Sequence, residues 1–258
     1  MELKLNVGKS VEQNAEKYFE QAKKYKKKIP GIKKTIELYK DKLTKAEDIH
    51  SKQQVIREPK QKKEWFEKFR WFISSDDFLV IGGRDATTNE IIVKKYLDKN
   101  DMVFHTELAG SPFVIIKNPD NKDIPKQTIT ESAEFCASFS KSWKSGRTTA
   151  EVYHINPEQV SKEAPSGTSA LAKGSFMING KRNYIAAVLN LAICNIGRIM
   201  TGPVSAIKKQ CEDKELKYIE IIQGQNKLSD IGKKIQKVIG GDLDEIVRNL
   251  PPECAIKK

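Results

Sequence analysis

Residues 78–90 read FLVIGGRDATTNE, and this stretch indicates a strand followed closely by a helix. Residues 78–81 are all apolar, which is typical of a short buried strand, and the two glycines after them mark its end. Thr87 and Glu90 have the spacing of a capping box, in which each side chain bonds the other residue's backbone amide at a helix start. The stretch therefore predicts a strand, a glycine turn and a helix that reaches Tyr96.

The turn within this stretch has the features of a phosphate site. Gly82 and Gly83 carry no side chain to block the backbone, the helix start offers free amide groups, and Arg84 adds a guanidinium. A P-loop is excluded, because the stretch lacks the Gly-Lys-Ser/Thr ending of that motif. A second interpretation stays open, in which the segment is only a tight turn whose Arg84 pairs with Asp85.

Strands and helices alternate on either side of this segment. Residues 102–108 and 113–117 read as two strands, and residues 130–144 read as a helix. The pair Asn179-Gly180 lies between two apolar stretches and predicts a β-hairpin. Further expected elements are a helical stretch carrying Trp65, Phe69 and Phe72, helices at 204–211, 231–238 and 243–250, and a strand at 218–222. The pattern predicts an α+β fold with a mixed, mainly antiparallel sheet and flanking helices.

The N-terminal region predicts a long helical arm. Apolar residues recur from Val11 to Ala46 in alternating steps of four and three, which is the heptad pattern of a coiled coil. Ser10 and Gln13 form a capping box at its start. The pair Pro30-Gly31 predicts a kink or a short break, because proline removes a backbone donor and clashes inside a helix. The apolar stripe requires cover from a return helix, a second protomer or a docking surface.

The composition indicates a polyanionic partner. Among 258 residues, 46 Lys and Arg outnumber 34 Asp and Glu, which gives a net charge of +12. A surplus of this size favours nucleic acid or an anionic membrane surface. The sequence has neither an apolar run long enough to span a bilayer nor an apolar signal core after its first residues, so we expect a cytoplasmic protein with no membrane partner.

The four cysteines predict neither a metal site nor a disulfide framework. Cys136, Cys194, Cys211 and Cys254 are widely separated and have no nearby histidine pairs. They are typical of reduced thiols inside a cytosolic protein. We therefore expect no metal and no cofactor.

Two histidines give an alternative from a different functional class. His105 and Glu107 alternate along one expected strand, so both side chains point to the same face and could act as an acid–base pair. His154 follows Tyr153 on another expected strand and would complete an RNA-processing or tRNA-modifying site if the two histidines converged. The plainer interpretation is that each is a hydrogen-bonded structural histidine.

Cationic residues interleaved with aromatic residues favour RNA, because charge neutralises phosphate and rings stack on unpaired bases. Isolated surface lysines, in contrast, are usually only solvated charge, and this applies also to the Lys-rich arm. The residues predicted to bind RNA or phosphate are Arg70, Arg84, Asp85, Thr87, Asn89, Lys94, Lys95, His105, Ser111, Lys117, Ser140, Trp143, Lys173, Lys181 and Arg182.

The sequence resembles the NFACT-R domain of the NFACT family of ribosome-associated quality-control factors. The resemblance is carried by residues 65–72 (WFEKFRWF) and 78–90, and by later motifs at His105, Gly110-Ser111, Ser140 with Trp143, and residues 173–176. Residues 10–28 resemble part of the family's coiled coil, and residues 202–208 resemble a segment of archaeal members. The chain departs from the family at Asp77, where glycine is frequent, and the N-terminal NFACT module that precedes the coiled coil is absent.

The resemblance implies three parts: a Lys-rich coiled-coil arm at 1–58, an NFACT-R RNA-binding domain at 59–195, and a small αβ extension at 196–258. It also implies binding to the rRNA of a large ribosomal subunit that carries peptidyl-tRNA, and positioning of tRNA, commonly alanyl-tRNA, for template-free tailing of the stalled chain. Such a module would act by positioning and not as an enzyme. A surface adhesin, which an old family name suggests, conflicts with the missing signal core and the unpaired cysteines. A coiled-coil partner or self-association is expected for residues 11–46.

Overall fold

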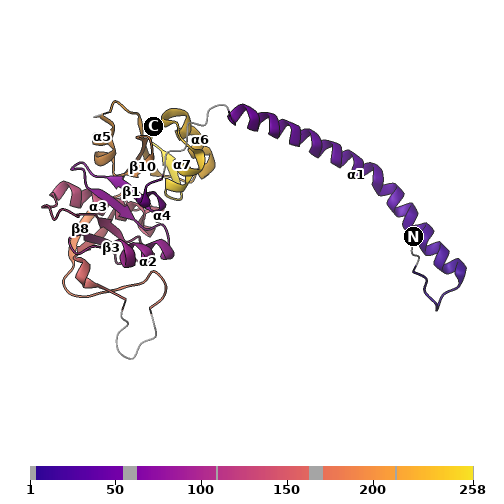
Figure 1. The fold of residues 1–258 in the computed structure, drawn as a ribbon, viewed down its shortest axis with the longest axis horizontal. Helices are drawn as coiled ribbons and strands as arrows, with labels where there is room; N and C mark the ends of the chain where they lie inside the picture. Colours follow the sequence, from indigo (N-terminus) through magenta and orange to yellow (C-terminus); the bar gives the residue numbers. More distant parts are fainter. Residues whose placement is uncertain (1–3, 55–62, 109, 163–170, 213, 258) are drawn as a thin grey trace. The chain divides into compact units, whose positions relative to one another are not determined.

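The computed structural model describes residues 4–54, 63–108, 110–162, 171–212 and 214–257. The chain divides into two compact units, Met1–Lys62 and Lys63–Lys258 (Figure 1). The first unit contains a long helix, α1 (Val11–Gln54), and the second contains two antiparallel sheets with short helices packed on them. The α+β fold class and the long N-terminal helix predicted from the sequence are therefore confirmed.

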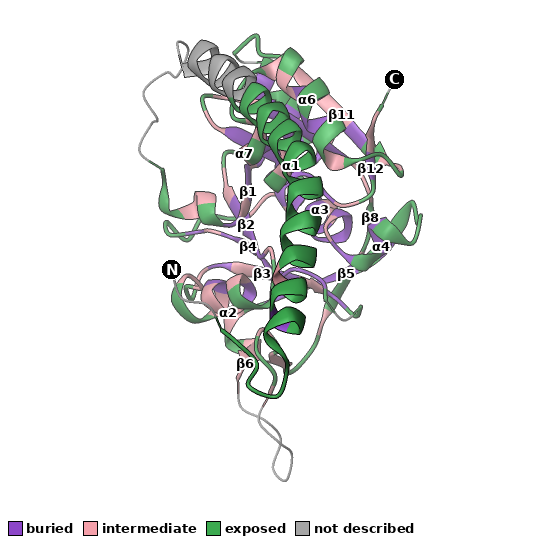
Figure 2. Ribbon diagram, turned by 90° about the vertical axis from the view of Figure 1, so that its right-hand side faces the viewer, coloured by how far each residue is buried: buried purple, intermediate pink, exposed green. Residues whose placement is uncertain are grey.

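Helix α1 begins where the capping box predicted. The Gln13 amide donates to Ser10 Oγ at 3.3 Å, and the Ser10 amide donates to Gln13 Oε1 at 3.2 Å. Helix α1 continues through Pro30, so a short break at Pro30-Gly31 is wrong, while a kink there stays a prediction. A proline forfeits its own amide donor, and the hydrogen bonds on either side keep the helix intact. The described apolar side chains of the heptad pattern are mostly exposed, as Figure 2 shows for α1.

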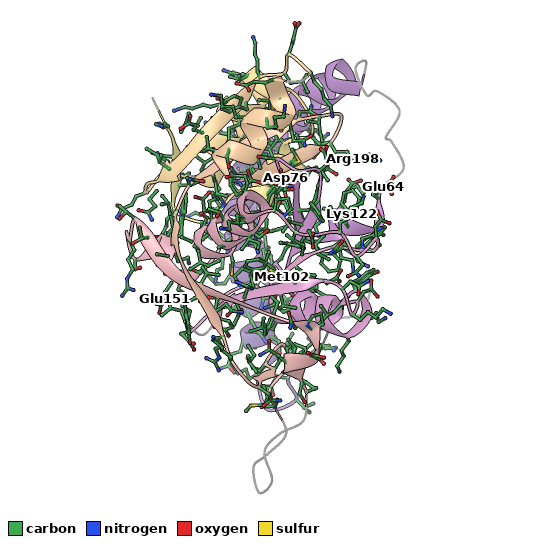
Figure 3. All side chains as sticks on the ribbon, turned by 90° about the vertical axis from the view of Figure 1, so that its left-hand side faces the viewer. Glu64, Asp76, Met102, Lys122, Glu151 and Arg198 are labelled. Carbon is green, nitrogen blue, oxygen red and sulfur yellow. The ribbon has the colours of Figure 1, made fainter. Side chains whose placement is uncertain are left out.

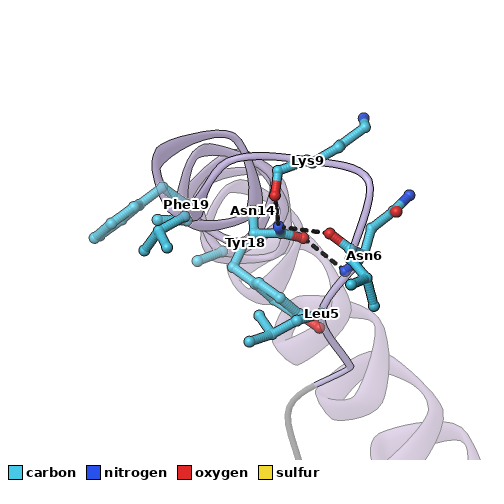
Figure 4. Close-up of a pocket in the computed structure, with 10 residues that line it drawn as sticks. Leu5, Asn6, Lys9, Asn14, Tyr18 and Phe19 are labelled. Atoms are coloured by element: carbon cyan, nitrogen blue, oxygen red, sulfur yellow. Dashed lines mark hydrogen bonds between the residues drawn. The ribbon is translucent and has the colours of Figure 1, made fainter.

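The residues before α1 fold back onto its first turns around Asn14 (Figure 4). The Asn14 side chain accepts from the Asn6 amide at 2.9 Å and donates to the carbonyls of Asn6 and Lys9. The Tyr18 hydroxyl donates to the Lys4 carbonyl at 2.7 Å. These bonds enclose an apolar hollow of about 680 Å³ on the arm.

The second unit is built around a six-stranded sheet in the order β1-β2-β4-β3-β5-β8, and every neighbouring pair is antiparallel. Its strands are β1 (Arg70–Ile73), β2 (Leu79–Gly82), β3 (Met102–Thr106), β4 (Val114–Ile116), β5 (Thr149–Ile155) and β8 (Asn183–Val188). Residues in register across antiparallel strands share a face, so the register fixes which side chains meet. Strand β8 is the last strand of the sheet on its side.

Helix α3 (Lys126–Ser138) packs on one face of this sheet. The rings of Phe72 and Phe135 lie 4.8 Å apart, and a Cβ added to Gly82 would lie 3.0 Å from Phe135 Cε1. Helix α4 (Lys141–Lys144) follows after a break at Ser140, so the single helix predicted for 130–144 is wrong. Ser140 ends one helix by donating to the Ala137 carbonyl and caps the next by accepting from the Ser142 amide.

The second sheet has the order β10-β9-β11-β12 and packs against β1. A Cβ on Gly202 would lie 2.8 Å from Phe72 Cβ, so the two sheets meet at close quarters. The predicted boundary between residues 195 and 196 falls in the β9–β10 hairpin, and the three-part division stays a prediction. The elements here are β9 (Leu191–Asn195), β10 (Ile199–Gly202), α5 (Val204–Glu212), β11 (Tyr218–Gln223), α6 (Leu228–Ile239), α7 (Leu243–Asn249) and β12 (Cys254–Ile256).

Two local predictions are wrong, for reasons visible in the structure. Asn179-Gly180 does not close a hairpin, because β7 (Met177–Ile178) pairs with β6 (Val160–Ser161) while β8 pairs with β5. Gly180 does take a positive φ of 79°, and the Gln159 side chain holds the turn by donating to the carbonyls on both sides of it.

The helical spacing of Trp65, Phe69 and Phe72 is also misleading. A short 3-10 helix, η1 (Trp65–Lys68), gives way to strand β1, where Phe72 pairs with Val80. Trp65 instead stacks on Tyr96, with ring centroids 4.7 Å apart. Asp77, where the family often has glycine, takes a left-handed φ of 62°, a conformation that glycine adopts most readily.

Glu134 on α3 makes part of the stability pH-dependent. Burial raises its pKa from 4.5 to about 7, with a smaller contribution from Glu131. The folded state therefore binds more protons than the unfolded state between these pH values, and stability falls as the pH rises through this window. We expect Glu134→Gln to raise the melting temperature above about pH 7 and to leave it unchanged below about pH 4.5.

The control for this substitution is Glu151→Gln, which removes an equal charge from an exposed position of β5 (Figure 3). Thermal unfolding followed by circular dichroism across the pH range makes the measurement. Parallel pH profiles for the wild type and Glu134→Gln would contradict this role of Glu134.

Candidate nucleic-acid interface

A cleft of about 1010 Å³ lies at one end of the six-stranded sheet. The turn after β2, the loop between β3 and β4, the α3–α4 junction and residues 173–178 line it. The predicted site residues that line the cleft are Arg70, Arg84, Asp85, Asn89, His105, Ser111, Ser140, Lys173 and Arg182. The predicted residues outside its lining are Thr87, Lys94, Lys95, Lys117, Trp143 and Lys181. The structure thus brings together side chains that the sequence scatters over more than a hundred positions.

The turn before α2 (Ala86–Lys95) is built differently from the sequence prediction. The cap is Asp85 and not Thr87: Asp85 Oδ1 accepts from the Thr88 amide at 2.8 Å. Gly83 is required because a Cβ there would lie 1.7 Å from Asn89 Oδ1. That oxygen accepts from the Phe113 amide at 3.1 Å. The glycine therefore makes room for a side chain of the protein itself.

Arg84 is held inside the fold, and in the described part of the chain its guanidinium donates to acceptors other than Asp85. Its Nε donates to the Lys68 carbonyl at 3.2 Å and its Nη2 donates to the Phe69 carbonyl at 2.7 Å. Further bonds reach the Arg248 carbonyl at 2.7 Å and Asn249 Oδ1 at 3.1 Å, at the end of α7. The pKa of Arg84 is lowered to about 9. Burial of the guanidinium is the main cause, and repulsion by Arg248 and Arg70 is the next. Its predicted phosphate contact stays a prediction, and a phosphate there would compete with these bonds.

Arg70 also lines the cleft, and one of its donors is unpaired in the described part of the chain. Its Nη1 donates to the Gly83 carbonyl at 2.8 Å, while its Nε is buried and has no hydrogen-bond partner in the described part of the chain. The guanidinium lies over the Phe139 ring, 4.5 Å from the centroid. Burial lowers the pKa of Arg70 to about 10. A cation with an unused buried donor beside a cleft is a candidate anion ligand.

His105 and His154 do not converge. In the register of β3 and β5, His105 pairs with Tyr153 while Phe104 pairs with His154, so the two imidazoles point to opposite faces of the sheet. The His105 ring stacks on Phe113 at 4.3 Å. Its Nδ1 lies 2.9 Å from the Pro112 carbonyl, which can only accept, so Nδ1 carries the proton. The predicted enzyme site with both histidines is therefore wrong.

Glu107 is likewise occupied by other side chains. Its Oε1 accepts from the Tyr184 hydroxyl at 2.7 Å and from Arg182. These two hydrogen bonds lower the pKa of Glu107. The carboxylate is therefore ionised and fixes the positions of a ring and a guanidinium. Tyr184 was not among the predicted site residues, although its expected strand was recognised.

The lysines at the cleft differ in exposure and in hydrogen bonding. The Lys141 side chain extends over Gly110, whose φ is +87°, and Lys173 is exposed. Lys162, behind them, donates to the carbonyls of Ala172 and Ser175 at 2.9 Å and so fixes the segment that carries Lys173. Lys141 and Lys173 are therefore exposed cations at the rim of the cleft.

The predicted residues outside the cleft lining have structural partners or lie elsewhere on the surface. Glu90 pairs with Lys94 at 2.7 Å, and Lys117 pairs with Asp98 and Asp101 at the opposite end of β4. Trp143 is only 2% exposed and donates from Nε1 to the Glu253 carbonyl at 3.2 Å. Its enclosed ring gives no face on which a base could stack.

Residues 68–180, which contain most of the cleft, match the family model of the NFACT protein RNA binding domain. The archaeal Rqc2 homolog aRqcH of Methanocaldococcus jannaschii is 37% identical over 215 residues, which cover 80% of this chain and 31% of that protein. The ribosome quality control complex subunit NEMF of Homo sapiens is 41% identical over 177 residues, which cover 67% of this chain and 16% of that protein. The chain thus spans less than a third of these relatives.

Among solved structures, the C-terminal part of the fibronectin/fibrinogen-binding protein from Streptococcus suis aligns over 70% of this chain and 76% of that chain. The identity is 20% and the TM-score is 0.39, which is too low to establish a shared fold. In the described part of the chain, no helix has the length and apolar character needed to cross a membrane.

These matches define the class of protein: the chain contains an NFACT RNA-binding domain. It is a homologue of the Rqc2 and NEMF family of ribosome quality control proteins, as the resemblance in its sequence indicated.

We expect Arg84→Ala to lower the free energy of unfolding by about 1–3 kcal/mol, because the substitution leaves backbone carbonyls without their donor. Urea unfolding gives this value, and Arg147→Ala, at an exposed arginine, is the control. Unchanged stability would contradict the structural role of Arg84. RNA affinity of the folded variant at two salt concentrations tests the phosphate contact separately, because a lost contact flattens the salt dependence.

Proposed function

We propose that the cleft at the end of the six-stranded sheet is the RNA-binding site of this domain, and that it acts by positioning RNA. The observation that carries the proposal is the charge of the lining. Six cationic residues and two acidic ones line the cleft; the cations are Arg70, Arg84, Lys141, Lys144, Lys173 and Arg182. A concave surface with a surplus of one charge raises the local concentration of an oppositely charged ligand.

The proposal extends to the partners that the relatives' names suggest. Ribosome quality control proteins are among the relatives of this chain, so we propose that its RNA ligands are rRNA of the large ribosomal subunit and tRNA. Alanyl-tRNA, positioned near peptidyl-tRNA for template-free tailing of a stalled chain, is the specific form of this proposal. The place of action would be the cytoplasm.

We further propose that residues 11–46 pair with another helix, either in a second copy or in a different chain. Their apolar side chains are exposed to solvent: Ile29, Ile32 and Ile36 are 47%, 55% and 49% exposed. A helix that exposes an unbroken heptad stripe gains stability when the stripe is covered.

The charge proposal predicts a salt-dependent loss of binding. In the double variant Lys141→Gln/Lys173→Gln, we expect RNA affinity to fall and the slope of log affinity against log salt to flatten by about 0.7 for each lost phosphate contact of a single strand. Fluorescence anisotropy at several salt concentrations measures both quantities.

The matched control is Lys122→Gln/Lys257→Gln, which removes the same charge from two exposed lysines that do not line the cleft. Lys122 is labelled in Figure 3. Equal losses in the two double variants would show that RNA responds to the overall charge and would exclude a cleft-specific site.

For the arm, we expect the wild-type chain to self-associate with rising concentration. Ile36→Glu should abolish this, because the substitution places a charged carboxylate in the apolar seam of the coiled coil. Leu38→Glu is the control, because Leu38 is 51% exposed but lies outside the heptad pattern. Sedimentation velocity makes the comparison. A wild-type monomer at every concentration would exclude self-association and leave pairing with a different chain.

A further inference from the structure

A row of aromatic rings crosses strands β3, β5 and β8 on one face of the six-stranded sheet and includes the residue before β4. His105 on β3 stacks on Phe113, which precedes β4, and in the strand register His105 pairs with Tyr153 and Tyr153 pairs with Tyr184. The ring centroids are 4.3 Å apart for Phe113 and His105, 6.2 Å for His105 and Tyr153, and 5.8 Å for Tyr153 and Tyr184. The row starts in the cleft and ends on the edge strand β8.

Exposure changes sharply along this row. Phe113 is 3% exposed and Tyr153 is 2% exposed, so both belong to the core. His105 is of intermediate exposure, and Tyr184, at 50%, is the most exposed member of the row. The inner rings therefore support the outer one, which offers a planar molecule the most accessible ring of the row.

The ring of Tyr184 is fixed although it is exposed. Its hydroxyl donates to Glu107 Oε1 at 2.7 Å, and the edge of the ring packs against Tyr153. The same carboxylate oxygen accepts from Arg182, whose guanidinium lies 5.0 Å from the centroid of the Tyr153 ring. A ring that is already immobilised loses little conformational entropy on binding, which favours its use as a contact surface.

We infer that Tyr184 is a stacking platform for an unpaired base of single-stranded RNA, whose phosphates continue into the cationic cleft beside Arg182. This inference rests on the proposed function, because it requires RNA in the cleft. Single strands can present the face of a base to a ring, whereas bases inside a duplex are already stacked on each other. The site therefore selects unpaired RNA and not merely negative charge.

The test compares RNA with and without bases at constant charge. A short uridine oligomer and a ribose–phosphate oligomer of the same length that lacks bases are titrated against the wild type, Tyr184→Ala and Tyr184→Phe. We expect the wild type to prefer the base-bearing oligomer by about 5- to 150-fold, the range that one stacked base contributes. Tyr184→Ala should lose this preference, and Tyr184→Phe should keep most of it because the ring remains.

The control variant is Val188→Ala, which truncates another exposed side chain on the same face of β8. We expect it to bind both oligomers as the wild type does. An equal loss for the two oligomers in Tyr184→Ala, or unchanged binding of both, would overturn the stacking assignment. Circular dichroism of each variant identifies any loss that comes from unfolding.

The outcome also separates this inference from the proposed function. If Lys141→Gln/Lys173→Gln weakens binding while Tyr184→Ala does not, the cleft binds RNA without a base on Tyr184. If neither variant changes the affinity, the cleft is not the RNA site and both proposals fail.

Discussion

The guanidinium of Arg84 connects the parts of the second unit that form the cleft. It donates to carbonyls that precede β1 and to the end of α7, while the Arg84 amide is held by Thr88 Oγ1 at the start of α2. A cation is favourable against carbonyls at a helix C-terminus, where the helix dipole is negative. Without it, the carbonyls that precede β1 and the polar groups at the end of α7 would lose their donor.

Fixing Arg84 in this place concentrates positive charge at one end of the sheet. Arg70 and Arg248 lie close enough to lower the pKa of Arg84, and among the acidic groups Asp85 and Glu245 act in the opposite direction. Two cations and two carboxylates thus surround the buried guanidinium. An anion in the cleft would interact favourably with Arg70 and Arg84, which both line it.

The sequence predicts the parts of the fold that depend on local pattern. Strands β2, β3 and β4, helices α5 to α7 and the start of α1 follow from apolar periodicity and capping. The elements at Asn179-Gly180 and at Trp65 to Phe72 were predicted wrongly, because contacts outside each segment decide them. Gln159 holds the Asn179-Gly180 turn, and Phe72 pairs with Val80 on the next strand. The cleft could be predicted in part. Four of its six cations, Arg70, Arg84, Lys173 and Arg182, were among the predicted site residues. The roles of Gly83, Glu107 and Tyr184 depend on side-chain contacts that spacing does not reveal.

The environment of Glu107 distinguishes a binding site from a catalytic one. A general acid or base must be free to exchange a proton with a ligand, but one oxygen of Glu107 accepts from both Tyr184 and Arg182. These bonds keep the carboxylate ionised and make it a support for two groups suited to RNA. Phosphate contacts position a strand but do not read its bases. A ring held by such a support adds the ability to recognise a free base face, and this combination explains why a carboxylate is found in a cleft whose other charges are mainly positive.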